Sequence, residues 1–163
     1  MSTAGSRASG NPKLPDAREG VVTLGHRPRL QKTMDATSRS TDSDARTAAR
    51  RWADTWAQAW PAKDVDAIAA LYAPEADFRS HPFREPENAR EYVRRVFAEE
   101  EGTAECGFGE PLVDADRAAV EYRAVLVYEG KETTLAGTTL LRFRADGLVV
   151  EHRDYWALEQ GRH

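Results

Sequence analysis

The chain has 163 residues, 40% of them hydrophobic, and a formal net charge of −4. This is enough for one domain around one hydrophobic core, and no stretch approaches the roughly 18–20 consecutive apolar residues that span a membrane. After residue 44 there are 16 Lys and Arg against 22 Asp and Glu, which argues against nucleic acid as the ligand of the folded part.

Residues 1–43 differ in composition from the rest of the chain. They are rich in Ser, Thr, Gly, Pro and Arg, with no apolar run longer than Val21-Val22. Such a segment cannot bury enough surface to offset the entropy lost on ordering, so we predict a disordered tail. It lacks the apolar centre of an export signal, and Met34 is an alternative start. The single Cys106 suits a reducing cytoplasm, where we expect the protein.

Residues 44–160 are predicted to form the folded domain, which opens with helices. A first helix runs from Ser43 or Asp44 to residue 60, a second covers 65–72, and a third follows Pro86. A short strand at 77–80 lies between the last two. The buried stripe of the first helix comprises Ala49, Trp52, Ala53, Trp56 and Trp60.

The second half of the domain has the alternation of β-strands. Strands are predicted at 104–113, 117–129, 131–144 and 148–156, with a tight hairpin at Glu129-Gly130. Helices followed by a strand meander indicate an α+β domain in which the helices pack on one face of the sheet.

The last predicted strand carries ionisable residues on its core face. That face holds Leu148, Val150, His152, Asp154 and Trp156, whereas Val149, Glu151, Arg153 and Tyr155 point the other way. Buried ionisable groups are costly unless they are paired or functional, so His152 and Asp154 indicate a pocket.

Two runs of the chain resemble the nuclear transport factor 2-like superfamily, and within it the SnoaL-like and ketosteroid isomerase-like proteins. One run extends from Asp64 to Phe78; the other is the pattern Gly130, Leu141, Asp146-Gly147, Asp154 and Trp156. The resemblance covers residues 44–158. It implies a cone-shaped α+β roll, in which a curved mixed sheet wraps around the N-terminal helices, with a pocket and frequent homodimerisation. It leaves the chemistry open.

The resemblance also locates positions where this chain departs from known chemistry. Ketosteroid isomerases need a tyrosine where Trp56 stands, an aspartate where Thr139 stands, and a base aspartate where this chain has Ser80 or His81. These three departures argue against steroid isomerisation. Arg123 superficially supplies part of an epoxide hydrolase set, but it shares a face with surface charges.

Asp154 is the leading catalytic candidate, since SnoaL-like cyclases use an aspartate of the last strand as general acid/base. His81 or His152 would assist it. An aromatic wall suggests an apolar or aromatic small molecule as the ligand. The predicted substrate-binding residues are Trp52, Trp56, Phe78, Tyr92, Val96, Tyr122, Leu126, Tyr128, Thr139 and Trp156.

Three functions follow from these residues. The first is an enzyme without cofactor, namely an isomerase, cyclase, dehydratase or hydrolase. The second is a module that binds a small molecule or peptide without turnover, and the third is a dimerisation domain whose outer sheet face, centred on Val125 and Leu140, joins two copies. A metal site built from His81, His152 and Asp154 is a weaker alternative, so we expect neither metal nor cofactor.

Overall fold

The computed structural model describes residues 28–163, so the disorder predicted for residues 1–27 lies outside the described part. The predicted α+β class is confirmed. The helices are α1 (Pro28–Ala62), α2 (Val65–Ala69) and α3 (Ala89–Glu99), and the strands are β1 (Tyr72–Arg79), β2 (Glu101–Phe108), β3 (Leu112–Asp114), β4 (Arg117–Tyr128), β5 (Lys131–Phe143) and β6 (Val149–Gln160).

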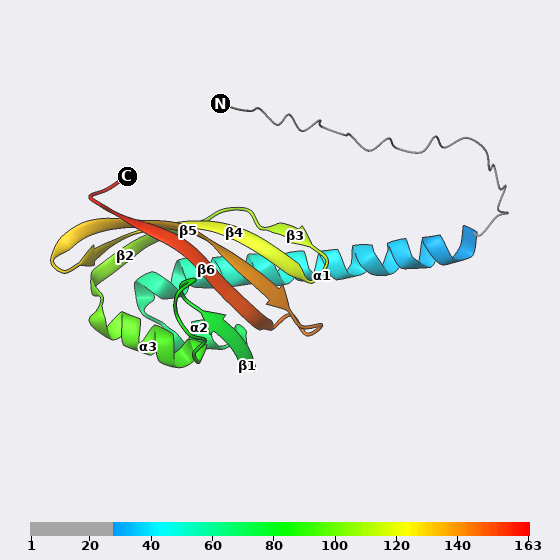
Figure 1. Cartoon of the computed structure of the whole chain (residues 1–163), viewed down its shortest axis with the longest axis horizontal. Coiled ribbons are helices and arrows are strands. Elements are labelled where there is room, and N and C mark those ends of the chain that lie inside the picture. The colour runs from blue at the N-terminus through cyan, green and yellow to red at the C-terminus, as the bar shows by residue number, and fades with distance from the viewer. Residues whose placement is uncertain (1–27) are drawn as a thin grey trace, which may run out of the picture.

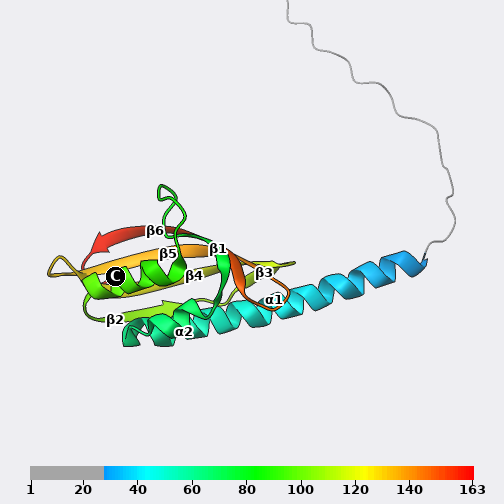
Figure 2. The ribbon, with the colours of Figure 1, turned by 90° about the horizontal axis from the view of Figure 1, so that it is seen from below.

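The strands form one curved, mixed sheet that the helices cover on a single face. The strand order is β1-β6-β5-β4-β2, and β3 pairs with β4 beside β2. Only the β1–β6 pairing is parallel among those described. α1 lies along the inner face of the sheet, and α2 and α3 close that side of the domain (Figures 1 and 2). The core therefore lies between α1 and the concave face.

α1 is longer than the sequence pattern predicts. It begins at Pro28, so the predicted start at Ser43 or Asp44 was wrong; proline at a first helical position fits its preset φ. Its first turns extend past the end of the sheet (Figure 1). The predicted stripe is confirmed, since all five of its residues are buried. Within residues 28–163 no helix combines the length and the apolar character that crossing a bilayer takes.

The last turn of α1 contains Pro61. Because proline has no N–H, the carbonyl of Ala57, four residues earlier, lacks its usual helical hydrogen bond. The thiol of Cys106 on β2 approaches this carbonyl at 3.7 Å. Burial raises the pKa of the Cys106 thiol to about 11, so it remains protonated and can donate. The cysteine thus joins helix and sheet.

The boundary between α2 and β1 differs from the prediction. A helix was predicted to reach Tyr72 and a strand to begin at Asp77, but β1 already begins at Tyr72. Tyr72 pairs with Val149 of β6, and this pairing over a long sequence distance overrides the local helical preference. Pro74 is exposed in this edge strand, where the missing N–H costs no ladder bond.

The hairpin between β4 and β5 is confirmed, and β2 is shorter than predicted. Glu129 and Gly130 both have positive φ, as a two-residue hairpin turn requires. The strand predicted at 104–113 is divided into β2 and β3, which both pair with β4, because residues 109–111 (Gly-Glu-Pro) interrupt the strand between them.

A β-bulge at Val150 changes the faces at the start of β6. Val149 pairs with Phe143 and Glu151 with Arg142, so Val150 is the extra residue. Val149 is therefore buried, and the prediction that Val150 faces the core and Val149 the outside was wrong. After the bulge the predicted alternation holds, and His152 is buried.

Gly137 of β5 allows the close approach of β6 beside the cavity. It pairs with Trp156, and a Cβ added at Gly137 would lie 2.7 Å from Trp156 Cβ and closer still to the Tyr155 carbonyl oxygen. The sheet backbone cannot yield as a flexible side chain would. A glycine is therefore required at this position.

We expect Gly137→Ala to lower the free energy of unfolding by about 1–3 kcal/mol, since the added methyl overpacks a well-packed site. Urea unfolding followed by tryptophan fluorescence measures the change. Gly107→Ala is the matched control, because its Cβ would meet nothing within 4 Å. Equal stability of the two variants would contradict the steric requirement.

Candidate active site

A cavity of about 330 Å³ lies between α1, α3 and the concave face of the sheet. Its walls are mainly aromatic and aliphatic, with a few polar groups. Eleven of the thirteen predicted site residues line it: Trp52, Trp56, Tyr92, Val96, Tyr122, Leu126, Tyr128, Thr139, His152, Asp154 and Trp156.

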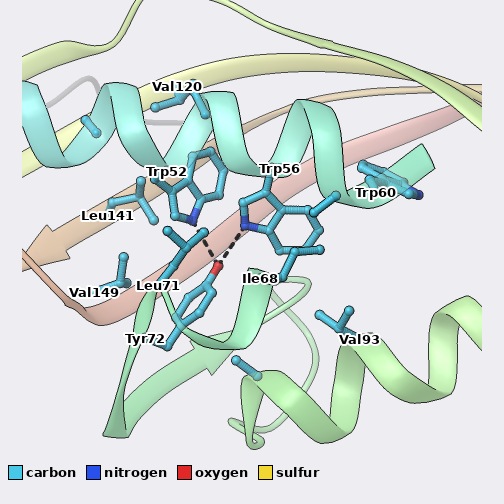
Figure 3. Close-up of a cluster of buried hydrophobic side chains, with 14 of the residues drawn as sticks. Trp52, Trp56, Trp60, Ile68, Leu71, Tyr72, Val93, Val120, Leu141 and Val149 are labelled. Carbon is cyan, nitrogen blue, oxygen red and sulfur yellow. Dashed lines mark hydrogen bonds between the residues drawn. The ribbon is translucent and has the colours of Figure 1, made fainter. Parts of the chain in front are cut away.

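The hydroxyl of Tyr72 is the centre of a buried hydrogen-bond network. Trp52 and Trp56, one helical turn apart on α1, each donate an indole N–H to it, with N···O distances of 3.0 and 3.2 Å (Figure 3). The same hydroxyl lies 3.0 Å from Nδ1 of His152 on β6. One oxygen from β1 therefore connects the long helix to the strand that carries the candidate catalytic groups.

The donor count of this network determines the tautomer of His152. A phenol oxygen accepts at most two hydrogen bonds and donates one. Because both acceptor positions of Tyr72 are taken by indole N–H groups, its own proton must go to Nδ1. Nδ1 is then an acceptor, and the ring proton sits on Nε2.

The ring of His152 is enclosed by aromatic side chains. Phe78 of β1 stacks against it with ring centroids 4.2 Å apart, and Trp52 packs at 5.9 Å. Nε2 lies 3.0 Å from Oδ2 of Asp154, but the N–H direction is not aligned with this oxygen, so Nε2 has no hydrogen-bond partner among residues 28–163. The contact is one of charge and dipole rather than an aligned hydrogen bond.

Asp154 is the ionisable group of this network that is most open to the cavity. Its Oδ1 accepts the hydroxyl of Thr139, the residue directly opposite on β5, at 2.5 Å. Its side chain is 14% exposed against 2% for His152. Both residues line the cavity, but a ligand there can reach the Asp154 carboxylate more readily than the His152 ring.

Two tyrosines that line the cavity are held as neutral phenols. Burial raises the pKa of Tyr122 far above its usual range, and the nearby charge of Asp154 raises it further. Burial and Asp154 also raise the pKa of Tyr92. Both side chains thus keep an O–H that can donate to a ligand oxygen.

Two predicted site residues do not line the cavity. Phe78 is fully buried behind His152. His81 packs edge-on against Trp156 at 4.9 Å and accepts the Phe83 main-chain N–H. The neighbouring Ser80 is also buried, and its carbonyl accepts the Trp156 indole N–H at 2.6 Å. In the described part of the chain, no three His, Cys, Asp or Glu residues gather as metal ligands.

Tyr72 and Glu100 are among the residues of the site that the sequence did not predict. The helix predicted over residues 65–72 hid the place of Tyr72 in a strand beside the cavity. Glu100 is the middle residue of three consecutive glutamates; it lines the cavity and accepts the Trp60 indole N–H at 2.8 Å. Within a run of consecutive glutamates, the sequence alone does not indicate which side chain points into the cavity.

Comparison with known proteins agrees with this architecture. The family described as SnoaL-like domain matches residues 49–152. A structure described as a candidate ketosteroid isomerase from Kribbella flavida is 24% identical (TM-score 0.55; 72% of this chain, 82% of that one). An LEH-like epoxide hydrolase from M. tuberculosis is 15% identical (TM-score 0.57; 71% and 84%). At these identities they show the shared fold alone. Among curated proteins, none matches this chain.

We expect Tyr72→Phe to destabilise the fold by about 2–4 kcal/mol, because it leaves two indole donors and Nδ1 of His152 without their partner. Urea unfolding measures this loss. Tyr155→Phe, on the exposed outer face, is the control. In ¹⁵N spectra the wild-type ring should show a protonated Nε2, and the variant a mixture of tautomers. A protonated Nδ1 in the wild type would reverse the direction assigned to the Tyr72 bond.

Proposed function

The chain belongs to the SnoaL-like family, and we propose that it is an enzyme without cofactor that isomerises, cyclises, dehydrates or hydrolyses an apolar or aromatic small molecule. Asp154 is the general acid/base of this reaction. The observation that carries the proposal is the carboxylate of Asp154, which faces an aromatic cavity and lies against Thr139 and His152.

The orientation of Asp154 supports a proton-transfer role. Thr139 stands where the ketosteroid isomerase resemblance would require a second acid, and it donates its hydroxyl to Oδ1. Oδ2 faces the Nε2 side of a neutral imidazole. The carboxylate is thus fixed in direction, and none of the ion pairs among the described residues joins it to a lysine or arginine. A carboxylate held in this way can serve as a general base toward a substrate in the cavity.

The proton step uses the groups that line the cavity. Asp154 removes a proton from an activated C–H of the substrate or from a water, and the electron pair left on the substrate moves toward a carbonyl or leaving oxygen. The neutral phenol of Tyr122 donates a hydrogen bond to that oxygen as charge develops. Asp154 then returns the proton to the product, which leaves the enzyme unchanged.

His152 acts in this proposal as a positioning residue. Its Nδ1 is occupied by Tyr72 and its ring is buried between Phe78 and Trp52, so it cannot rotate to meet a ligand. Its Nε2–H limits where the Asp154 carboxylate can lie. The assistance to Asp154 that the sequence predicted for His81 or His152 thus becomes, in this proposal, the positioning of the carboxylate by His152.

We also propose that two copies associate through the outer sheet face. Leu112, Leu140 and Tyr155 are exposed there, and Leu112 and Leu140 lie in one cross-strand row on either side of Ala119. An apolar row on a sheet face is suited to contact with a second copy.

If this face forms the dimer, Leu140→Glu should yield a monomer in sedimentation velocity at concentrations where the wild type is dimeric. The charge would have to be buried unpaired in the interface. Phe83→Glu, in an exposed loop away from this face, is the control and should stay dimeric. A wild type that sediments as a monomer at every concentration would refute the proposed dimer.

The proposed role of Asp154 as a base can be tested without the natural substrate, by using a simple compound with an acidic C–H bond. 5-Nitrobenzisoxazole opens to a coloured phenolate when a base removes its C–H proton. We expect wild-type protein to accelerate this opening, and Asp154→Asn to reduce kcat/KM by about a hundredfold or more. The asparagine has the size of the aspartate and its one carbonyl oxygen can still accept the Thr139 hydroxyl, so the fold should persist.

Asp114→Asn, at an exposed acid of β3, is the matched control and should keep the wild-type rate. Circular dichroism and the urea midpoint confirm that each variant is folded. An Asp154→Asn protein with the full rate would place the base elsewhere. A wild type that binds the probe without opening it would favour the module that holds a ligand without turnover.

A further inference from the structure

We propose that Glu100 is a second polar anchor of the cavity, which binds a hydroxyl or amine at the far end of an elongated apolar ligand. This inference rests on the proposed function, since it assumes that the cavity holds an apolar small molecule beside Asp154. It adds a requirement on that molecule, namely a hydrogen-bond donor at the end remote from the reacting group.

The carboxylate of Glu100 has one oxygen with a partner and one without. Oε2 accepts the indole N–H of Trp60 at 2.8 Å. Oε1 is buried and has no hydrogen-bond partner among residues 28–163. A buried carboxylate oxygen left unpaired is costly, and a ligand that donates to it removes that cost. The side chain lines the cavity, and a small turn of its carboxylate about the last side-chain torsion, which is weakly restricted, presents Oε1 to a donor there.

Other contacts hold Glu100 in place without satisfying this oxygen. Glu100 caps α3, where its main-chain N–H donates to the Val96 carbonyl at 2.9 Å. Lys63 donates its ammonium to the main-chain oxygen of Glu100 at 2.6 Å. The Lys63 ammonium therefore binds the main chain and not the carboxylate. None of the ion pairs among the described residues includes the Glu100 carboxylate.

The tryptophans of α1 indicate the distance between the two polar ends of the cavity, at Asp154 and at Glu100. Trp52 packs against His152 at the Asp154 end, and Trp60 bonds Glu100 at the other. They stand eight residues apart in one helix, or about 12 Å along its axis at 1.5 Å per residue. Trp56 and Leu126 line the cavity as well and supply apolar wall. The cavity therefore fits a rigid apolar molecule with a polar group at each end.

Rigid stilbenes provide matched probes for this geometry. 4-Hydroxystilbene has one polar end, whereas 4,4′-dihydroxystilbene and 4-amino-4′-hydroxystilbene carry a donor at both ends. Titrations followed by tryptophan fluorescence give Kd for each. We expect both two-donor probes, or one of them, to bind wild-type protein about tenfold more tightly than the one-donor probe, as a hydrogen bond to a charged group implies. Which of the two gains shows whether the ligand donor is a hydroxyl or an amine.

Glu100→Gln identifies the residue. The glutamine oxygen can keep the Trp60 bond, which turns its N–H₂ toward the position of Oε1, so the tenfold preference should vanish. 4-Hydroxy-4′-methoxystilbene, whose far end only accepts, should then bind more tightly to the variant than to wild type. Glu101→Gln, an exposed neighbour that does not line the cavity, should behave as wild type.

The possible results distinguish a failure of the Glu100 role from a failure of the proposed function on which it rests. Equal binding of one-donor and two-donor probes to wild-type protein, or an unchanged preference in a folded Glu100→Gln variant, overturns the role of Glu100 and leaves the catalytic proposal standing. If none of the stilbenes binds the wild type, the aromatic ligand of the proposed function fails, and the distal anchor fails with it.

Discussion

The site depends on one hydroxyl group. Tyr72 Oη receives two indole N–H groups from α1 and donates to His152 on β6, so helix, edge strand and central strand meet at a single atom. In a buried setting each of these polar groups is expensive to leave unpaired, which makes the arrangement mutually dependent. The imidazole tautomer follows from this network, and with it the direction in which Nε2–H faces Asp154.

The cavity combines an aromatic wall with carboxylates at two ends. Asp154 is oriented by Thr139 and His152, and Glu100 by Trp60. Burial keeps the phenols of Tyr92 and Tyr122 protonated, and the charge of Asp154 acts in the same direction. The site therefore offers a proton acceptor and neutral donors side by side, which is the pairing that general acid/base chemistry needs. The SnoaL-like fold supplies the cavity, and these side chains decide what happens in it.

Sequence patterns identified most of the elements and most of the wall. The helical spacing of Trp52, Trp56 and Trp60 and the alternation in β4 and β5 placed their residues on the correct faces. The predicted elements are wrong where strand pairing between residues far apart in the sequence overrides the local preference of the chain. Tyr72 follows a helical run but pairs with Val149, and Val150 breaks the alternation because β6 must stay in register with β5.

By itself, the sequence determined that His152 and Asp154 share the inner face of a β-strand near many aromatic residues, because period and composition are local properties. The tertiary structure decided which of the two is more exposed to the cavity, that His81 lies outside the cavity, and that Glu100 lies within it. Those outcomes depend on distances between atoms far apart in the chain. The proton on His152 is the clearest case, since its position follows from two tryptophans and a tyrosine that no local pattern connects to it.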